Sequence, residues 1–419
     1  MPTLSRRRFL GLTGIAAAGG AAAWAGLLRE RLAGGDHFGA GRILVLVQCG
    51  GGNDGLNTLV PAGAGRYRDA RPSLAPEEDR LIAVPGNDRL ALHPALGSLR
   101  PLWEAGSIAA LQGIGYEQRS RSHFQSMQAW WTGDPTAQGR DGWLGRWLRA
   151  TGAADDNPLA AVVLGGGPAS AVRAEGTVST VVSNLRAFRL RAPGPAGVDA
   201  VRDALLASAR PLAPDPTLSA AQQALPDALN ACALLSSIAP PNGSRDEDGG
   251  PEAEGERAGA ISAGLDAAAR LVALDGTAGL GIRVIAVGGG GFDTHANQAG
   301  THAALLADLA GGIAGFFEQI EATGDAERVL LVTTSEFGRR VAENGSGGTD
   351  HGAAGVQFIA GVGVRGGVVG DVDLGHLVDG DLRPTIDVRS LYSVALDWLG
   401  GPVDEVVGRP FDGYGILRP

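Results

Sequence analysis

Short apolar runs recur along the chain and alternate with longer segments in which apolar and polar positions follow a helical period. The run at 42–48, rich in Ile, Leu and Val, is followed at once by a glycine cluster. This pattern is typical of a strand buried on both faces of a mostly parallel sheet. Comparable runs, each ending in glycine or polar residues, predict further strands at 107–112, 161–164, 283–287, 329–334 and 356–360.

The segments with a helical period predict helices between these strands, at 95–105, 123–131, 144–150, 201–209, 218–237, 258–274, 301–323 and 388–399. Strands that alternate with helices predict a doubly wound α/β fold, with a mostly parallel sheet and helices on both faces. Ligands of such folds bind outside the carboxyl ends of the strands. The loops after the predicted strands are therefore the places where we expect reactive side chains.

The length of 419 residues would allow more than one domain. Large single α/β domains reach this size, and we predict one domain over 42–419. The segment at about 239–257 is acidic, rich in Pro and Gly and without apolar anchors. It is predicted to be a disordered surface insertion of that domain.

The charge balance limits the partners of the chain. There is no lysine, and 35 arginines face 45 acidic residues for a formal charge of −10. Nucleic acid is excluded as an expected partner, because no basic stripe would displace counterions from phosphates. The two cysteines, Cys49 and Cys232, lie far apart and form no CxxC metal or redox pair, although a disulfide between them stays open.

The first 35 residues have the features of an export signal. A basic start with Arg6 and Arg7 before Phe9 and Leu10 precedes a mild Gly/Ala-rich apolar run, and A-x-A follows at 23–25. Paired arginines in this setting predict a twin-arginine signal peptide, with the twin-arginine translocase as a partner during export. The alternative is an N-terminal membrane anchor. The expected location is the periplasm or the cell exterior, tethered to the membrane if the signal is not cleaved.

Carboxylates and imidazoles gather in the loops after the predicted strands. Each has an alternative interpretation as a turn or cap residue, but the chain has only 7 His. Together these loops offer enough oxygen and nitrogen ligands for two divalent metal ions. The candidate ligands are Asp54, Asp293, His295, Glu336, Asp350 and His351.

A fourth segment combines a helix start with a hydroxyl group. Ser122 is a predicted N-cap, with Gln125 three residues later as in a capping box. At a helix N-terminus the Ser122 hydroxyl would meet a bound phosphate or sulfate, although it could equally be only a cap. His123 beside it, and His93, are further candidates. The apolar positions of this helix share one face at i, i+3 and i+7: Phe124, Met127 and Trp131.

These segments together resemble a known family, the exported bacterial proteins with the domain of unknown function numbered 1501, in the alkaline phosphatase and sulfatase superfamily. The resemblance covers nearly the whole chain after the signal. It rests on the twin-arginine start and on the motifs at 51–57, 92–94, 121–124, 131–133, 292–295, 335–339 and 348–352. It implies an alkaline-phosphatase-like α/β fold.

The resemblance also implies roles for individual residues. Asp54 and Glu336 would bind one metal ion and Asp293, His295 and His351 the other, while Asp350 could belong to either. Ser122 would be the nucleophile, with His123 beside it. Arg121 or Arg339 would clamp the remaining anionic oxygens.

The leading hypothesis is therefore an exported metal-dependent hydrolase of phosphate or sulfate esters, acting on a small-molecule or glycan ester. Zn, Mg, Mn and Ca remain open as its metal ions. The rival hypothesis is a non-catalytic binding or assembly protein on a degenerate hydrolase fold. A serine esterase is disfavoured because there is no G-x-S-x-G elbow, and a formylglycine sulfatase because there is no C/S-x-P-x-R segment.

Overall fold

The computed structural model describes residues 41–117, 120–155, 157–185, 188, 190, 195–208, 216–237 and 259–419. The predicted signal peptide, 1–35, and the predicted acidic insertion at about 239–257 lie outside the described residues.

A single large sheet forms the centre of the fold, and it contains all six strands predicted from the apolar runs. Their bounds are β1 (Ile43–Cys49), β5 (Ile108–Gly115), β6 (Ala161–Gly165), β8 (Val284–Gly289), β9 (Val329–Thr334) and β10 (Gly355–Ala360). The order across the sheet is β11-β5-β10-β9-β1-β8-β6-β7, and β12 also pairs with β5. The sequence did not indicate the three short strands β7 (Thr180–Val182), β11 (Gly367–Val369) and β12 (Ile386–Asp387).

The sheet is mostly parallel. The first strand lies at its centre, with Val45 opposite Ile285 of β8 on one side and Leu331 of β9 on the other. Every residue of β1 is buried, as its uninterrupted apolar run predicts. Only β10 runs against its neighbours β5 and β9. The prediction of a doubly wound, mostly parallel α/β fold is confirmed, with β10 as the exception.

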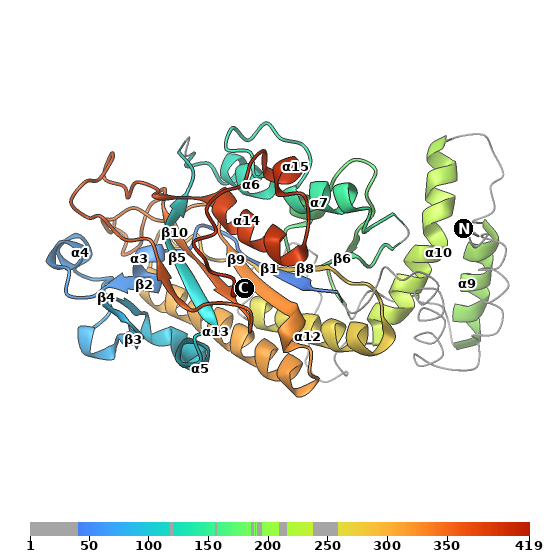
Figure 1. The fold of residues 1–419 in the computed structure, drawn as a ribbon, viewed down its shortest axis with the longest axis horizontal. Helices are drawn as coiled ribbons and strands as arrows, with labels where there is room; N and C mark the ends of the chain where they lie inside the picture. Colours follow the sequence, from blue (N-terminus) through green and yellow to red (C-terminus); the bar gives the residue numbers. More distant parts are fainter. Residues whose placement is uncertain are drawn as a thin grey trace.

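Helices cover both faces of the sheet (Figure 1). One face carries α5 (Arg100–Glu104), α12 (Ala260–Ala278) and α13 (Gln298–Ala322), and the other carries α6 (His123–Thr132), α7 (Trp143–Thr151), α14 (Val388–Leu399) and α15 (Val403–Val407). By length and composition alone, α13 could cross a membrane, but half of its most apolar 18-residue stretch is buried in the fold. In Figure 1, α9 (Pro195–Ser208) and most of α10 (Pro216–Ser237) stand away from the body.

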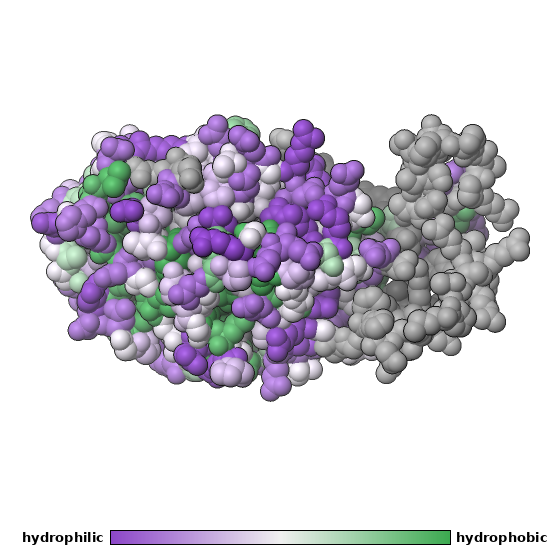
Figure 2. Space-filling model, turned by 45° about the horizontal axis from the view of Figure 1, so that its top comes forward, coloured by the Kyte–Doolittle hydropathy of each residue, from purple (hydrophilic) through white to green (hydrophobic). Residues whose placement is uncertain are grey.

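Smaller elements complete the fold. A second, antiparallel sheet has the order β2-β4-β3. Its strands and the remaining short helices are β2 (Leu59–Pro61), β3 (Ile82–Val84), β4 (Asn87–Leu92), α3 (Gly55–Thr58), α4 (Gly65–Ala70), α8 (Ala169–Val172), η2 (Glu78–Arg80), η3 (Pro94–Leu99) and η4 (Ala326–Arg328). Polar residues cover most of the face seen in Figure 2, and a band of apolar residues crosses its middle.

The loops after β1, β8 and β9 touch one another, and glycines make this contact possible. Gly51 has φ +116°, and a Cβ on it would lie 2.4 Å from the backbone nitrogen of Asp293. A Cβ on Gly348 would lie 2.3 Å from the carbonyl carbon of His295. Because such contacts exclude any side chain, the glycine-rich loops bring the candidate ligands together at the carboxyl end of the sheet.

Candidate metal centre

Three chain segments meet at this end of the sheet and form a cluster of imidazoles around one carboxylate. His123 begins α6, Asp293 and His295 follow β8, and His351 lies in the connection between β9 and β10. The ligand atoms of His123, Asp293 and His351 all lie within 4.8 Å of one another. We call these three residues with His295 the histidine–aspartate cluster.

Asp293 is the centre of the cluster. Its Oδ1 lies 3.0 Å from His351 Nε2 and 3.1 Å from His295 Nε2, and its Oδ2 lies 3.3 Å from His123 Nε2. Partial burial tends to raise the pKa of Asp293, but hydrogen bonds from Arg339 and His351 outweigh it and lower that pKa to about 2. The carboxylate is therefore anionic at neutral pH.

The three imidazoles all direct Nε2 towards Asp293, because each has an acceptor beside its other ring nitrogen. The Nδ1 partners are Glu336 Oε1 at 2.8 Å from His123, Asp350 Oδ1 at 3.3 Å from His295, and the carbonyl oxygen of Arg121 at 2.7 Å from His351. An acceptor at Nδ1 keeps a proton on that nitrogen, so each Nε2 can bind a metal ion once it has released its own proton, including the proton that His351 donates to Asp293.

Two features of this arrangement favour a bound cation. His295 Nε2 and His351 Nε2 are only 2.8 Å apart, so two lone pairs would repel each other unless a proton or a metal ion were shared between them. His123 Nε2 is buried, and although Asp293 Oδ2 lies 3.3 Å away, the two atoms do not form a hydrogen bond, nor does any other described residue bond to this nitrogen. Buried polar atoms are rarely left unpaired, so the donor set fits a bound divalent metal ion.

Glu336, predicted as a metal ligand, contacts His123 through Oε1, and its Oε2 is buried with no hydrogen-bond partner among the residues that the structure describes. Its Oε1 accepts hydrogen bonds from His123 Nδ1 and from the backbone N–H of Gly51, at 2.8 and 2.9 Å. The hydrogen bond that His123 donates to Glu336 raises the pKa of His123, and burial partly opposes this effect. A carboxylate in this place orients the imidazole and increases its basicity as a ligand.

Asp54, also predicted as a metal ligand, lies apart from the cluster and already has a cationic partner. Its side chain is fully buried, and Arg71 Nη1 lies 2.6 Å from its Oδ2. Burial tends to raise the pKa of Asp54, but the charge of Arg71 contributes to a net lowering. A second metal site at Asp54 and Glu336 stays a prediction, and in this structure the cationic partner of Asp54 is Arg71.

Arg339 was expected to clamp a substrate anion, and the structure corrects that expectation. Its side chain is 0% exposed and donates to four carbonyl oxygens and to Asp293 Oδ1, the last at 2.7 Å. With its donors directed at the protein, Arg339 holds the loops together and cannot reach a substrate. Arg121 is half-exposed, but its guanidinium pairs with Asp381 Oδ2 at 2.8 Å.

Ser122 is exposed and is the N-cap residue of α6, as predicted, but the predicted capping box is wrong. The Ser122 side chain makes no capping hydrogen bond, and Gln125 Oε1 instead accepts from Ser120 Oγ at 2.7 Å. The sequence pattern also grouped Phe124 with Met127 and Trp131 on one apolar face, but the Phe124 side chain is 87% exposed. Ser122 lies in sequence between Arg121, whose carbonyl oxygen contacts His351, and His123 of the cluster.

Two further histidines and one arginine have structural partners outside the histidine–aspartate cluster. His302, whose role the sequence did not indicate, is buried with its Nε2 2.9 Å from Asn53 Oδ1, and burial lowers its pKa to about 4. His93 Nδ1 accepts the backbone N–H of Ala95 as a helix cap, which is a structural role. Arg71 was missed because nothing in the segment around it marks a site.

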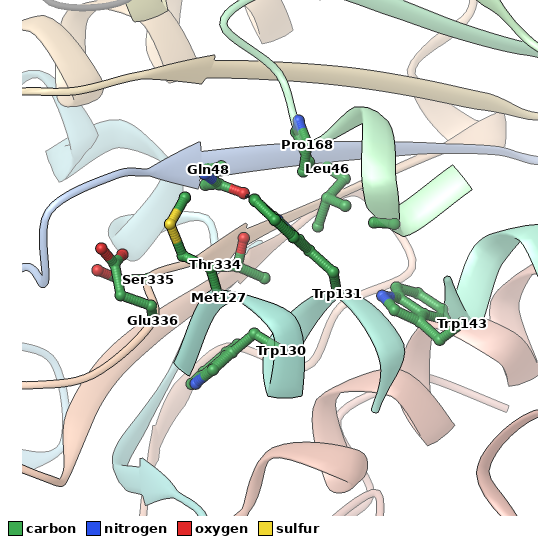
Figure 3. Close-up of a pocket in the computed structure, with 11 residues that line it drawn as sticks. Leu46, Gln48, Met127, Trp130, Trp131, Trp143, Pro168, Thr334, Ser335 and Glu336 are labelled. Atoms are coloured by element: carbon green, nitrogen blue, oxygen red, sulfur yellow. Dashed lines mark hydrogen bonds between the residues drawn. The ribbon is translucent and has the colours of Figure 1, made fainter. Parts of the chain in front are cut away.

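A small cavity lies between α6 and the strands of the sheet, beside Glu336 (Figure 3). Its volume is about 10 Å³, close to the space that one water molecule needs. In Figure 3, Glu336 lies at one end of the lining group and Trp143 at the other, with Met127 and Trp131 between them. The cavity is too small for any ligand larger than about one water molecule.

Fold and cluster define a doubly wound α/β protein with imidazole and carboxylate groups gathered at the carboxyl end of its sheet. The chain belongs to the family described as "Protein of unknown function (DUF1501)", whose model matches residues 92–400. This confirms the family predicted from the motifs. A comparison with curated proteins gives no match.

Several solved structures are similar in fold, at low identity. The lipoteichoic acid synthase LtaP from Listeria monocytogenes is 8% identical, with 93% of this chain and 81% of that chain covered and a TM-score of 0.37. The phosphonate monoester hydrolase SpPMH from Silicibacter pomeroyi is 12% identical, with 90% and 77% covered and a TM-score of 0.36. The PsFucS1 sulfatase from Pseudoalteromonas sp. is 10% identical, with 91% and 73% covered and a TM-score of 0.38. Scores this low carry no argument about the chemistry of this chain.

Proposed function

We propose that this chain is a metal-dependent hydrolase of phosphate or sulfate esters that holds one divalent metal ion in the histidine–aspartate cluster. The observation that carries the proposal is the convergence of three imidazole Nε2 atoms on Asp293, each imidazole having a separate acceptor at Nδ1. His123, Asp293 and His351 are the proposed ligands. His295 is the fourth, or leaves that position open to substrate.

The residues of the cluster and their neighbours would have separate roles in binding the metal ion. Asp293 supplies the negative charge of the ligand set, and Arg339 and the three Nδ1 acceptors fix its geometry. A divalent metal ion in this place would act as a Lewis acid on the oxygens of the ester. Imidazole ligands with one carboxylate suit a transition metal better than Mg²⁺ or Ca²⁺, which prefer oxygen ligands.

Ser122 is the proposed nucleophile. The backbone around it is held on both sides, by the His351 contact with the carbonyl oxygen of Arg121 and by the place of His123 in the cluster. The Ser122 hydroxyl is exposed and lies at the N-terminus of a helix of 10 residues. Backbone N–H groups at this end favour an anionic ester group close to the hydroxyl.

The first experiment is metal analysis of the purified, metal-reconstituted protein, with hydrolysis of 4-nitrophenyl phosphate and 4-nitrophenyl sulfate measured on the same samples. We expect about one equivalent of bound metal, lost together with activity in Asp293→Ala and His351→Ala. His376→Ala is the matched control, because His376 is exposed and contacts only Asp373 among the acidic residues described. Bound metal without hydrolysis of either ester would favour the binding or assembly role instead.

Export by the twin-arginine route, to the periplasm or the cell exterior, is part of the same proposal. It rests on the sequence at 1–35 alone. The test is to replace Arg6 and Arg7 by lysine and to follow the full chain by cell fractionation. Retention inside the cell supports the route, and unchanged export contradicts it.

A further inference from the structure

A buried amide, Gln298, joins Asp54 to both loops that carry the proposed metal ligands. Gln298 is the first residue of α13 and is 0% exposed. Its Nε2 donates to Asp54 Oδ2 at 2.5 Å. Its Oε1 accepts from two hydroxyls, Thr294 Oγ1 at 3.0 Å and Thr349 Oγ1 at 2.6 Å. One side chain thus contacts three separate loops.

The chemistry of these partners allows only one orientation of the amide. The NH₂ group must face the carboxylate of Asp54, and the oxygen must face the two hydroxyl donors. The reversed amide would place Gln298 Oε1 against the Asp54 carboxylate. Arg71 balances the charge of Asp54, so the amide nitrogen and the amide oxygen of Gln298 both have satisfied partners. A buried hydrogen-bond network in which every group is satisfied is rigid.

The two threonines stand next to the proposed ligands. Thr294 lies between Asp293 and His295, and Thr349 lies two residues before His351. Both hydroxyls meet at one oxygen atom, and the backbone N–H of Thr349 also donates to the carbonyl oxygen of Thr294 at 3.1 Å. The position of Gln298 Oε1 therefore limits how far the Asp293 loop and the His351 loop can separate.

We infer that Gln298 is a positioning residue of the metal centre, which sets the separation of the Asp293 and His351 loops with Asp54 as its fixed anchor. Asp54 acts on the site through Gln298, and no ligand role is needed for it. This inference rests on the proposed metal centre, but Gln298 itself touches neither metal nor substrate.

The test compares Gln298→Met with Gln357→Met. Methionine keeps the size of glutamine and removes its hydrogen bonds. Gln357 is the matched control, because it is buried in β10 and its amide oxygen accepts from Thr333 Oγ1, away from the cluster. We measure the affinity for Zn²⁺, the visible spectrum of the Co²⁺-loaded protein, the unfolding midpoint, and the NMR signals of His295 and His351 in metal-free protein.

We expect Gln298→Met to weaken metal binding about tenfold and to shift the Co²⁺ spectrum and both histidine signals, while Gln357→Met lowers only the unfolding midpoint. Thr349→Val, which removes one hydroxyl, should weaken metal binding several-fold and remains informative if Gln298→Met does not fold. Wild-type affinity and unchanged histidine signals in Gln298→Met and Thr349→Val would overturn the inference and leave the metal centre standing. A wild type that binds no metal would overturn the proposed centre, while the metal-free histidine signals would still decide the role of Gln298.

Discussion

At the scale of single residues, two buried arginines hold carboxylates in place: Arg339, which was expected to bind a substrate anion, and Arg71, which the sequence did not indicate. Arg339 keeps Asp293 anionic from a fully buried position, and Arg71 does the same for Asp54. A buried guanidinium is tolerated only because carbonyl and carboxylate oxygens occupy its donors. Both arginines therefore shape the site without offering a group to a substrate.

The ion pair of Arg71 with Asp54 gives a prediction about stability. Arg71→Met should lower the free energy of unfolding by about 3–5 kcal/mol, because it leaves the buried Asp54 charge uncompensated. Arg89→Met breaks an exposed pair with Asp371 and should change stability little. Urea unfolding of both variants measures the difference, and equal effects would contradict the importance of burial.

His302 gives a prediction about pH. Its pKa is about 4 in the folded protein against an ordinary value of 6.5, so the unfolded chain takes up a proton first as the pH falls. The stability contributed by neutral His302 is complete above pH 6.5 and is lost as the pH falls towards 4. Between pH 6.5 and pH 4 the free energy of unfolding of the wild type should fall by about 2–3 kcal/mol more than that of His302→Gln. Parallel pH profiles of unfolding for the two proteins would contradict this.

At the scale of elements, the strands and helices with a long, clear period could be predicted and the contacts between loops could not. The run at 42–48 is apolar throughout 43–47 because β1 is buried on both faces, so its pattern was unambiguous. The orientation of β10 depends on its pairing with β5 and β9, which no local pattern reports.

The site was predictable to the same degree. Asp293, His295 and His351 were found because they follow strands. Arg71 and Gln298 were missed as partners of Asp54, because their contacts span 17 and 244 residues of sequence.

The contact of Gly348 with the loop that carries His295 gives a prediction about metal affinity. Gly348→Ala would place a Cβ 2.3 Å from the carbonyl carbon of His295, so the loops must separate and metal affinity should fall at least tenfold. Gly345→Ala is the control in the same loop, because nothing lies within 4 Å of the added Cβ. Titration with Zn²⁺ in the presence of a competing chelator measures both affinities. Equal affinities would show that this contact does not set the ligand geometry.

At the scale of the whole molecule, the proposed metal ion would join segments that are distant in sequence. A ligand that binds only the folded state stabilises it, by about 2.7 kcal/mol when its concentration is 100 times the dissociation constant. Removing metal with EDTA should therefore lower the unfolding temperature of the wild type and leave that of His351→Ala unchanged. Differential scanning calorimetry gives this comparison, and an equal shift in both proteins would point to metal bound elsewhere.

The central place of β1 has a consequence for the synthesis of the chain. β1 ends at Cys49, but its two neighbours begin at Val284 and Val329. At roughly 5–20 residues per second, a ribosome needs on the order of 15–60 s between the first strand and the last of these partners. During that interval a strand with five consecutive apolar residues, 43–47, has no sheet to join, so the nascent chain depends on protection from aggregation. The proposed metal centre would form only after His351 has left the ribosome.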